Sequence, residues 1–133
     1  MIPDVVSIYA PGIPVPQGSK QIVRRGAKSW LIDVGHDKLH TWRANVAGHA
    51  RQVMDGAEPF DEPVKVRLTF RMPRPKRPKF KVPGVRPDID KLTRAVLDAI
   101  TGPVLVDDSL VVELTATQEY DEKPGVHVHV AAW

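Results

Sequence analysis

The chain of 133 residues has no cysteine and few aromatic residues, and what it lacks excludes several classes of protein. Without cysteine it can form neither disulfides nor thiolate metal sites, which fits a reducing compartment. No apolar run approaches the roughly 20 residues that span a bilayer. No basic segment followed by an apolar stretch opens the chain, as it would in a signal peptide. A chain of this length is expected to build one hydrophobic core. We therefore expect residues 1–133 to form a single cytoplasmic domain with no membrane contact.

Acidic residues are also missing from one stretch of the chain, residues 71–86. Its seven bases are Arg71, Arg74, Lys76, Arg77, Lys79, Lys81 and Arg86. The whole chain has a formal charge of +3, so the remainder carries about −4 (3 minus 7). Concentrated positive charge beside a mildly acidic body predicts a polyanionic partner. The alternative is a solvated loop. A weaker basic cluster consists of Lys20, Arg24, Arg25 and Lys28.

Alternating apolar and polar residues predict several strands. The clearest covers residues 63–72, where apolar residues alternate with mostly basic ones, so one face is expected to be buried and the other basic. Prolines and glycines indicate an extended loop over residues 11–20. Weaker patterns predict four more strands, at residues 5–10, 29–33, 111–119 and 126–131.

Two helices are predicted from apolar residues spaced three and four apart. The second runs from Asp88 to about Thr101, where Gly102 and Pro103 end it. The basic stretch before it contains five prolines between residues 73 and 87, which predicts a long loop. The first helix covers residues 37–54 and is expected to bury Leu39, Trp42, Val46, Ala50 and Val53.

Together, two helices on a mixed, mostly antiparallel sheet give an α+β, two-layer domain.

The start of the second predicted helix carries two carboxylates. Pro87 disfavours helical geometry in the residue before it, and Asp88 is a favoured N-cap residue. Asp90 then lies in the first turn, where the helix dipole favours a carboxylate. Their oxygen donors suit Mg²⁺. Arg94 lies on the same face as Asp90, where it could offset the negative charge or meet a phosphate.

A third carboxylate is expected from the pair Asp107 and Asp108, just ahead of the strand at 111–119. Neighbouring residues in a strand point to opposite faces, so one of the pair could reach the site. Strand parity alone does not say which one.

A purely structural interpretation stands beside this one. Asp88 would then only cap the helix, Asp90, Arg94 and Asp98 would form surface ion pairs, and the later aspartates would form a turn. An isolated Asp-x-Asp is a weak signal. Its combination with a basic segment and a second acidic pair favours the functional interpretation.

The string Pro87-Asp-Ile-Asp-Lys-Leu-Thr-Arg-Ala-Val-Leu-Asp-Ala-Ile-Thr-Gly102, followed by Asp107-Asp-Ser-Leu-Val111, closely resembles the RusA family of Holliday junction resolvases. The resemblance is strong over residues 86–113. It is looser over Pro14 to Lys20, which is similar to the opening segment of phage-type members.

The resemblance implies that the metal-binding aspartates are Asp88, Asp90 and Asp108. The family's catalytic lysine falls on Arg94, and its common asparagine is Lys91 here. Arginine keeps the positive charge but cannot transfer a proton near neutral pH, so an electrostatic role stays open at this position, and Lys91 could instead supply the ammonium group.

The activity that the resemblance implies is metal-dependent hydrolysis of DNA at four-way junctions, with Mg²⁺ as the ion and Mn²⁺ as a substitute. Family members act as homodimers that make paired symmetric nicks. The expected DNA contacts are the seven bases at 71–86 and Lys91. One alternative is a non-catalytic protein that binds branched DNA. A metal-dependent transferase using Asp-x-Asp is much less favoured, because a glycine-rich phosphate loop is missing.

The histidines and aromatic residues add little to this hypothesis. Neither pair of histidines, His36 with His40 or His127 with His129, has a nearby third ligand for zinc in the sequence. Phe80, among bases and prolines, is the aromatic residue expected to contact DNA, whereas Trp42 fits the core. Trp30 is a further aromatic residue that could stack on bases.

Overall fold

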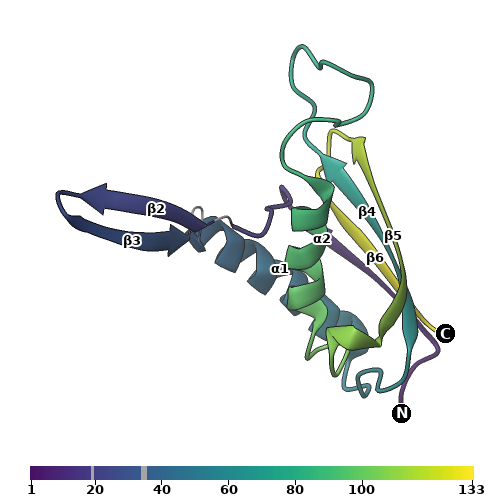
Figure 1. Ribbon diagram of the computed structural model, residues 1–133. Helices are drawn as coiled ribbons and strands as arrows, with labels where there is room; N and C mark the ends of the chain where they lie inside the picture. The colour runs from purple at the N-terminus through teal and green to yellow at the C-terminus, as the bar shows by residue number, and fades with distance from the viewer. Residues whose placement is uncertain (19, 34–35) are drawn as a thin grey trace.

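Four strands form one mixed sheet, and two helices lie on one of its faces (Figure 1). Across the sheet the strands are β1 (Val5–Pro11), β6 (Gly125–Ala132), β4 (Val64–Met72) and β5 (Val111–Tyr120). Strand β6 is antiparallel to β1 and to β4, whereas β4 and β5 are parallel. The helices are α1 (His36–Met54) and α2 (Ile89–Ile100). The predicted α+β class with a mixed, mostly antiparallel sheet is confirmed.

The computed structural model describes residues 1–18, 20–33 and 36–133. The side chains of residues 20–24, 30–33 and 36 lie outside this description, and with them the roles considered for Lys20, Arg24, Trp30 and His36. Among the described helices, each is too short or too polar to cross a membrane.

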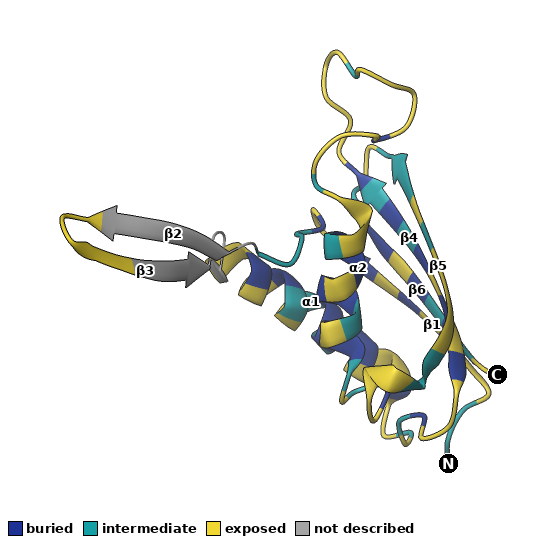
Figure 2. Ribbon diagram, in the orientation of Figure 1, coloured by how far each residue is buried: buried dark blue, intermediate teal, exposed yellow. Residues whose placement is uncertain are grey.

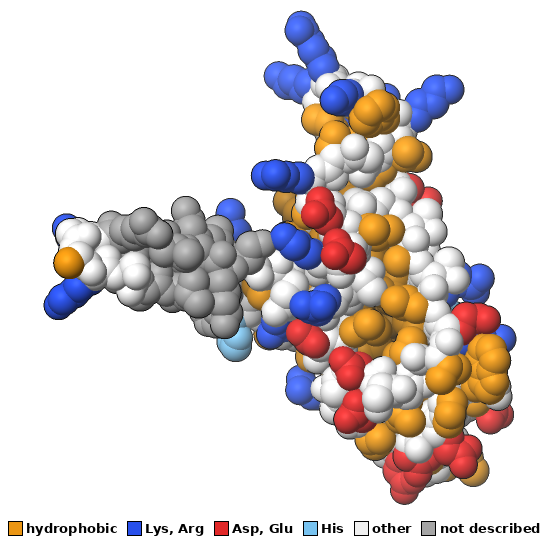
Figure 3. Space-filling view, in the orientation of Figure 1, with side chains coloured by type: hydrophobic (Ala, Val, Ile, Leu, Met, Phe, Trp, Pro, Cys, Tyr) orange, Lys and Arg blue, Asp and Glu red, His pale blue; other side chains and the backbone are white. Residues whose placement is uncertain are grey.

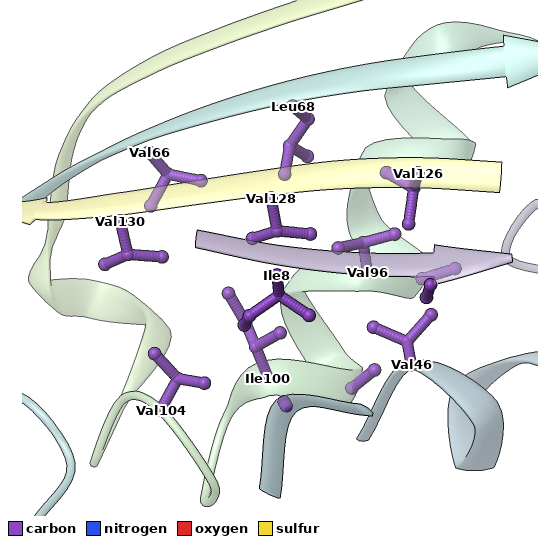
Figure 4. Packing of buried hydrophobic residues seen from close by; sticks show 14 of the residues in the cluster. Ile8, Val46, Val66, Leu68, Val96, Ile100, Val104, Val126, Val128 and Val130 are labelled. Carbon is purple, nitrogen blue, oxygen red and sulfur yellow. The ribbon is translucent and has the colours of Figure 1, made fainter. Parts of the chain in front are cut away.

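The core lies between the helices and the sheet, as the strand alternation predicts. In β4, residues 64, 66, 68, 70 and 72 are buried, and the residues between them face away from the helices. Leu68 pairs in register with Val128 of β6, and both contact the layer formed by Val46, Val96 and Ile100 (Figure 4). Burying aliphatic side chains of this size contributes about 1.5–3 kcal/mol each.

Helix α1 buries four of the five residues expected of it, Leu39, Trp42, Val46 and Ala50. The fifth expectation was wrong, because Val53 is 47% exposed and Met54 is buried in its place. The buried row continues at a spacing of four, from residue 46 to 50 to 54, up to the last residue of the helix. The backbone then turns at Asp55 and Gly56, both with positive φ.

Strands β2 (Lys20–Arg25) and β3 (Lys28–Asp33) form a separate antiparallel hairpin that projects away from the sheet (Figure 1). The strand expected at 29–33 is confirmed, but β2 was not predicted. Its sequence was noted only for its bases, which gave no sign of a partner strand. Gly26, with φ of 65°, makes the tight turn at the tip, where Arg25 and Lys28 are exposed.

The connection from β4 to β5 determines where the candidate site residues lie. Because β4 and β5 are parallel neighbours, the chain must return along the sheet between them, and α2 makes this return. Helix α2 therefore begins near the end of β4 and ends near the beginning of β5. Residues 73–87 extend as a long loop beyond the end of β4, immediately before α2 (Figure 1).

Candidate active site

The start of α2 presents two exposed carboxylates, as predicted. Asp88 is the N-cap residue with extended backbone geometry, but its side chain makes no capping hydrogen bond. Asp90 lies in the first helical turn, and both side chains are exposed. Neither carboxylate forms an ion pair with any described residue. Both are therefore accessible to a ligand at the positive end of the helix dipole.

Arg94 is exposed one turn beyond Asp90, on the same face of α2. The surface ion pairs of Asp90, Arg94 and Asp98, which the purely structural interpretation requires, do not form among the described residues. Asp98 instead pairs with Arg43 of α1, at 3.4 Å between Nη2 and Oδ2. This pairing leaves Arg94 with no ion pair among the described residues. Its guanidinium therefore remains available to an anionic ligand.

The N-terminal segment that resembles phage-type members holds the start of α2 in place. The Gln17 backbone N–H donates to the Lys91 carbonyl at 2.9 Å. Arg43 of α1 donates to the Gln17 side-chain oxygen at 2.5 Å. Gln17 thus links the two helices beside the acidic residues. Sequence reasoning noted this segment but could not assign it this contact, which joins residues far apart in the chain.

The second acidic pair lies in a 3₁₀ turn, η1 (Asp108–Leu110), ahead of β5. The expectation that this pair enters the strand was wrong, so strand parity does not apply to it. Asp107 caps the turn by accepting the Ser109 backbone N–H at 2.8 Å. This hydrogen bond lowers the pKa of Asp107 below its ordinary value. Asp108 is exposed within the turn, so the two neighbours differ in their roles.

The structure brings Asp88 and Asp90 together but places Asp108 toward the other end of α2. Within residues 1–18, 20–33 and 36–133, no three histidine or acidic side chains form a group that could hold a metal ion. The donor types suit a hard divalent cation. Their arrangement in one chain does not fit a three-carboxylate metal site.

The basic segment is exposed over nearly its whole length (Figures 2 and 3). Phe80 is 49% exposed at its centre, with the Lys79 ammonium 5.5 Å from the ring centroid. Arg71 differs from the other bases. Its guanidinium pairs with Glu119 at 3.2 Å and with Asp121 at 2.6 Å. Two carboxylates therefore neutralise a charge that the sequence counted among the DNA contacts.

The histidine pair of β6 lies on the open face of the sheet, opposite the helices. The His129 ring nitrogen Nδ1 lies 3.0 Å from the Ser7 hydroxyl. The His127 ring lies 4.6 Å from the Tyr9 ring, centroid to centroid. These contacts account for both side chains, and among the described residues they gather no third metal ligand.

An exposed acidic helix start beside a strongly basic loop is an arrangement that suits phosphodiester cleavage. The sequence profile of one family, described as "Endodeoxyribonuclease RusA", matches residues 11–131. The chain therefore belongs to the RusA family of endodeoxyribonucleases, hydrolases that resolve Holliday junctions. It is also 28% identical over 136 residues to a Bacillus subtilis (strain 168) protein named "Uncharacterized protein YqaN", with 96% of each chain covered.

Proposed function

We propose that this protein cuts DNA at four-way junctions by paired symmetric nicks, acts as a homodimer and requires Mg²⁺, for which Mn²⁺ can substitute. The observation that carries the proposal is the pair of exposed carboxylates, Asp88 and Asp90, directly after the basic segment in a member of this nuclease family. Asp88 makes no capping hydrogen bond with its side chain, and neither carboxylate forms an ion pair with a described residue, so both are available to a ligand.

The basic segment is proposed to hold the DNA backbone next to the start of α2. Contacts between cations and phosphates provide affinity that depends on salt and little on sequence. Arg71 is left out of this surface, because its charge is already paired with Glu119 and Asp121. The proposed contacts are Arg74, Lys76, Arg77, Lys79, Lys81, Arg86 and Lys91.

Arg94 is proposed to stabilise negative charge on the phosphate being cut. Its guanidinium is exposed and without an ion pair among the described residues, one turn beyond Asp90. A guanidinium stays charged near neutral pH, so it can stabilise charge but cannot supply a proton.

The proposed metal ligands are Asp88, Asp90 and Asp108. Within the described residues, one chain does not gather them into a single site. A homodimer with two-fold symmetry would present two equivalent sites to a junction that has the same symmetry.

Nicking of a synthetic four-way junction tests the proposal. Each of the four strands is end-labelled in turn, and the protein is added with Mg²⁺ or with EDTA. We expect paired nicks in opposite strands that require the metal. The Asp90→Asn variant should lose activity by on the order of 100-fold or more, the scale of losing one electrostatic catalytic group. Its junction affinity should remain.

Asp98→Asn is the matched control, since Asp98 lies on the same helix but turns toward Arg43. It should cut within a few fold of the wild-type rate. Tight junction binding without nicking, in Mg²⁺ and in Mn²⁺, would instead identify a non-catalytic branched-DNA-binding protein.

A further inference from the structure

The weaker basic cluster, Lys20, Arg24, Arg25 and Lys28, has no role in the proposed function. It belongs to the β2–β3 hairpin, a two-stranded sheet separate from the main one. Residues 20–33 contain these four bases and one acid, Asp33, for a formal charge of +3 (4 minus 1). Because residues 71–86 carry +7, the rest of the chain carries −7 (3 minus 7 minus 3). All of the excess positive charge therefore lies on two segments.

These two basic segments project from an acidic body. Figure 1 shows the β2–β3 hairpin and the loop at 73–87 leaving the molecule in different directions. Basic side chains lie at the ends of both projections, and acidic side chains lie on the body between them (Figure 3). A straight duplex that follows one projection leads away from the other. A branched DNA can place one duplex arm along each.

The hairpin is attached to the body beside the start of α2. On its N-terminal side, the Gln17 backbone N–H donates to the Lys91 carbonyl at 2.9 Å, three residues before β2 begins. On its C-terminal side the chain enters α1, where Leu39 and Trp42 are buried in the core. Lys91 is the residue after Asp90. The root of the hairpin therefore lies next to the proposed active site.

The tip of the hairpin carries two like charges opposite each other. Arg25 and Lys28 pair in register across a two-residue turn, and both side chains are exposed. Neither forms an ion pair with any residue that the structure describes. Like charges directly opposite in an antiparallel pair are destabilising, and a two-stranded hairpin has little stability of its own to offset them. An anion bound at the tip would remove this repulsion.

We propose that the β2–β3 hairpin is a DNA-binding arm whose tip, Arg25 and Lys28, holds the phosphate backbone of a second duplex arm of branched DNA. The first duplex arm lies along the basic segment, and the start of α2 lies between the two. This inference rests on the proposed function, because it takes branched DNA as the ligand. It assigns the preference for branched over linear DNA to the hairpin.

The length of the hairpin sets where its tip meets the DNA. Each strand has 6 residues, and a strand of that length spans about 20 Å. Successive phosphates of one DNA strand lie about 3.4 Å apart along the duplex axis. The tip therefore reaches a phosphate about six nucleotides away from the root of the hairpin, within the second duplex arm.

Junction and duplex affinities test the DNA-binding arm. Fluorescence anisotropy at several salt concentrations, in EDTA so that no DNA is cut, compares a labelled four-way junction with a linear duplex. The Arg25→Gln, Lys28→Gln double variant should bind the junction about tenfold more weakly. The slope of log affinity against log salt should fall by about 1.8 for each bound subunit, at about 0.9 for each of two lost contacts. Affinity and slope for the linear duplex should match those of the wild type.

Two control variants separate the charge at the tip from the total charge. Arg51→Gln combined with Lys65→Gln removes two exposed bases that lie away from the start of α2, and it should bind the junction as the wild type does. Arg25→Lys combined with Lys28→Arg keeps both charges at the tip and should also match the wild type. Circular dichroism checks that all three variants fold.

Cross-linking tests the position of the tip. The chain has no cysteine, so Ala27→Cys provides a single labelling site in the exposed turn. Val53→Cys, at the far end of α1 where Val53 is 47% exposed, is the control. With a photoactivatable maleimide attached, the tip should cross-link to a junction arm about six nucleotides from the nick. The control should give no cross-link there.

The two proposals fail separately. Equal losses of affinity for junction and duplex, or an unchanged junction slope, would overturn the DNA-binding arm and leave the nuclease proposal standing. A double variant that keeps its junction affinity but loses oligomeric mass in sedimentation would assign the hairpin to a second copy of the chain and would also overturn it. If the wild type never cuts junctions but the double variant loses junction affinity alone, the nuclease function is wrong and the DNA-binding arm stands.

Discussion

At the scale of single residues, neighbours of the same type have different roles. Asp107 uses its side chain to cap η1, and the Ser109 N–H that it accepts lowers its pKa. Asp108 lies within the turn and is exposed. The resemblance favours Asp108 as the ligand, and the capping role of Asp107 supports that choice on independent, physical grounds.

Substitution of the two neighbours should therefore have opposite effects. Asp107→Asn keeps a capping oxygen and should retain junction cleavage, whereas Asp107→Ala loses the cap and should lower the free energy of unfolding. Asp108→Asn should abolish cleavage and leave stability nearly unchanged. Urea denaturation and nicking assays measure the two effects. Loss of cleavage in Asp107→Asn with full activity in Asp108→Asn would reverse the assignment.

Arg71 shows the same dependence on context. In the sequence, Arg71 is the first of the seven bases in a stretch, residues 71–86, that contains no acidic residue. In the fold, the end of β4 lies beside Glu119 and Asp121, and both pair with its guanidinium. The Lys123 backbone N–H and the Arg71 guanidinium together hold the pKa of Asp121 below its ordinary value. Arg71 therefore joins the end of β4 to the chain beyond β5.

At the scale of elements, the basic segment is a loop between β4 and α2 with a concentration of positive charge. Its prolines remove backbone donors and prevent it from joining the sheet. Its position, immediately before α2, places six exposed bases next to Asp88 and Asp90. An apolar side chain at its centre, Phe80, is half exposed and available to stack against a base.

Neutralising part of this element should change the salt dependence of binding. With Arg74, Arg77 and Lys79 all replaced by glutamine, the slope of log affinity against log salt should fall by about 0.9 for each lost phosphate contact. Arg51→Gln, at the far end of α1, is the control and should leave the slope unchanged. Fluorescence anisotropy with a labelled junction at several salt concentrations measures it. An unchanged slope in the triple variant would remove the segment from the interface.

At the scale of the whole molecule, the core between the helices and the sheet is distinct from the exposed surface of the helices. Leu68 and Val53 provide a test of the core, since both are apolar residues of regular elements but only Leu68 is buried. Leu68→Ala should lower the free energy of unfolding by about 2–5 kcal/mol. Val53→Ala should change it by less than about 0.5 kcal/mol. Urea denaturation of both variants tests this, and similar losses in both would show that the core is misassigned.

Much of this fold could be predicted from local pattern. Alternation in β4 and the three-to-four spacing in α2 each identify a buried face, because those periods are set by backbone geometry within one element. The N-cap position of Asp88 could be predicted for the same reason. The pairing of β2 with β3 could not be predicted in this way. The alternation of apolar and polar residues in β2 is short, and the turn between the two strands sets which strand it pairs with.

By itself, the sequence determined most of the local features: most of the elements and their apolar faces, the acidic start of α2, the basic loop before it and the family. Only the tertiary structure decided that Asp108 lies at the other end of α2, that Arg71 is paired and that β5 lies at the edge of the sheet. The reason is physical. Periodicity and capping depend on neighbours along the chain, whereas exposure and the meeting of distant charges depend on which surfaces pack together.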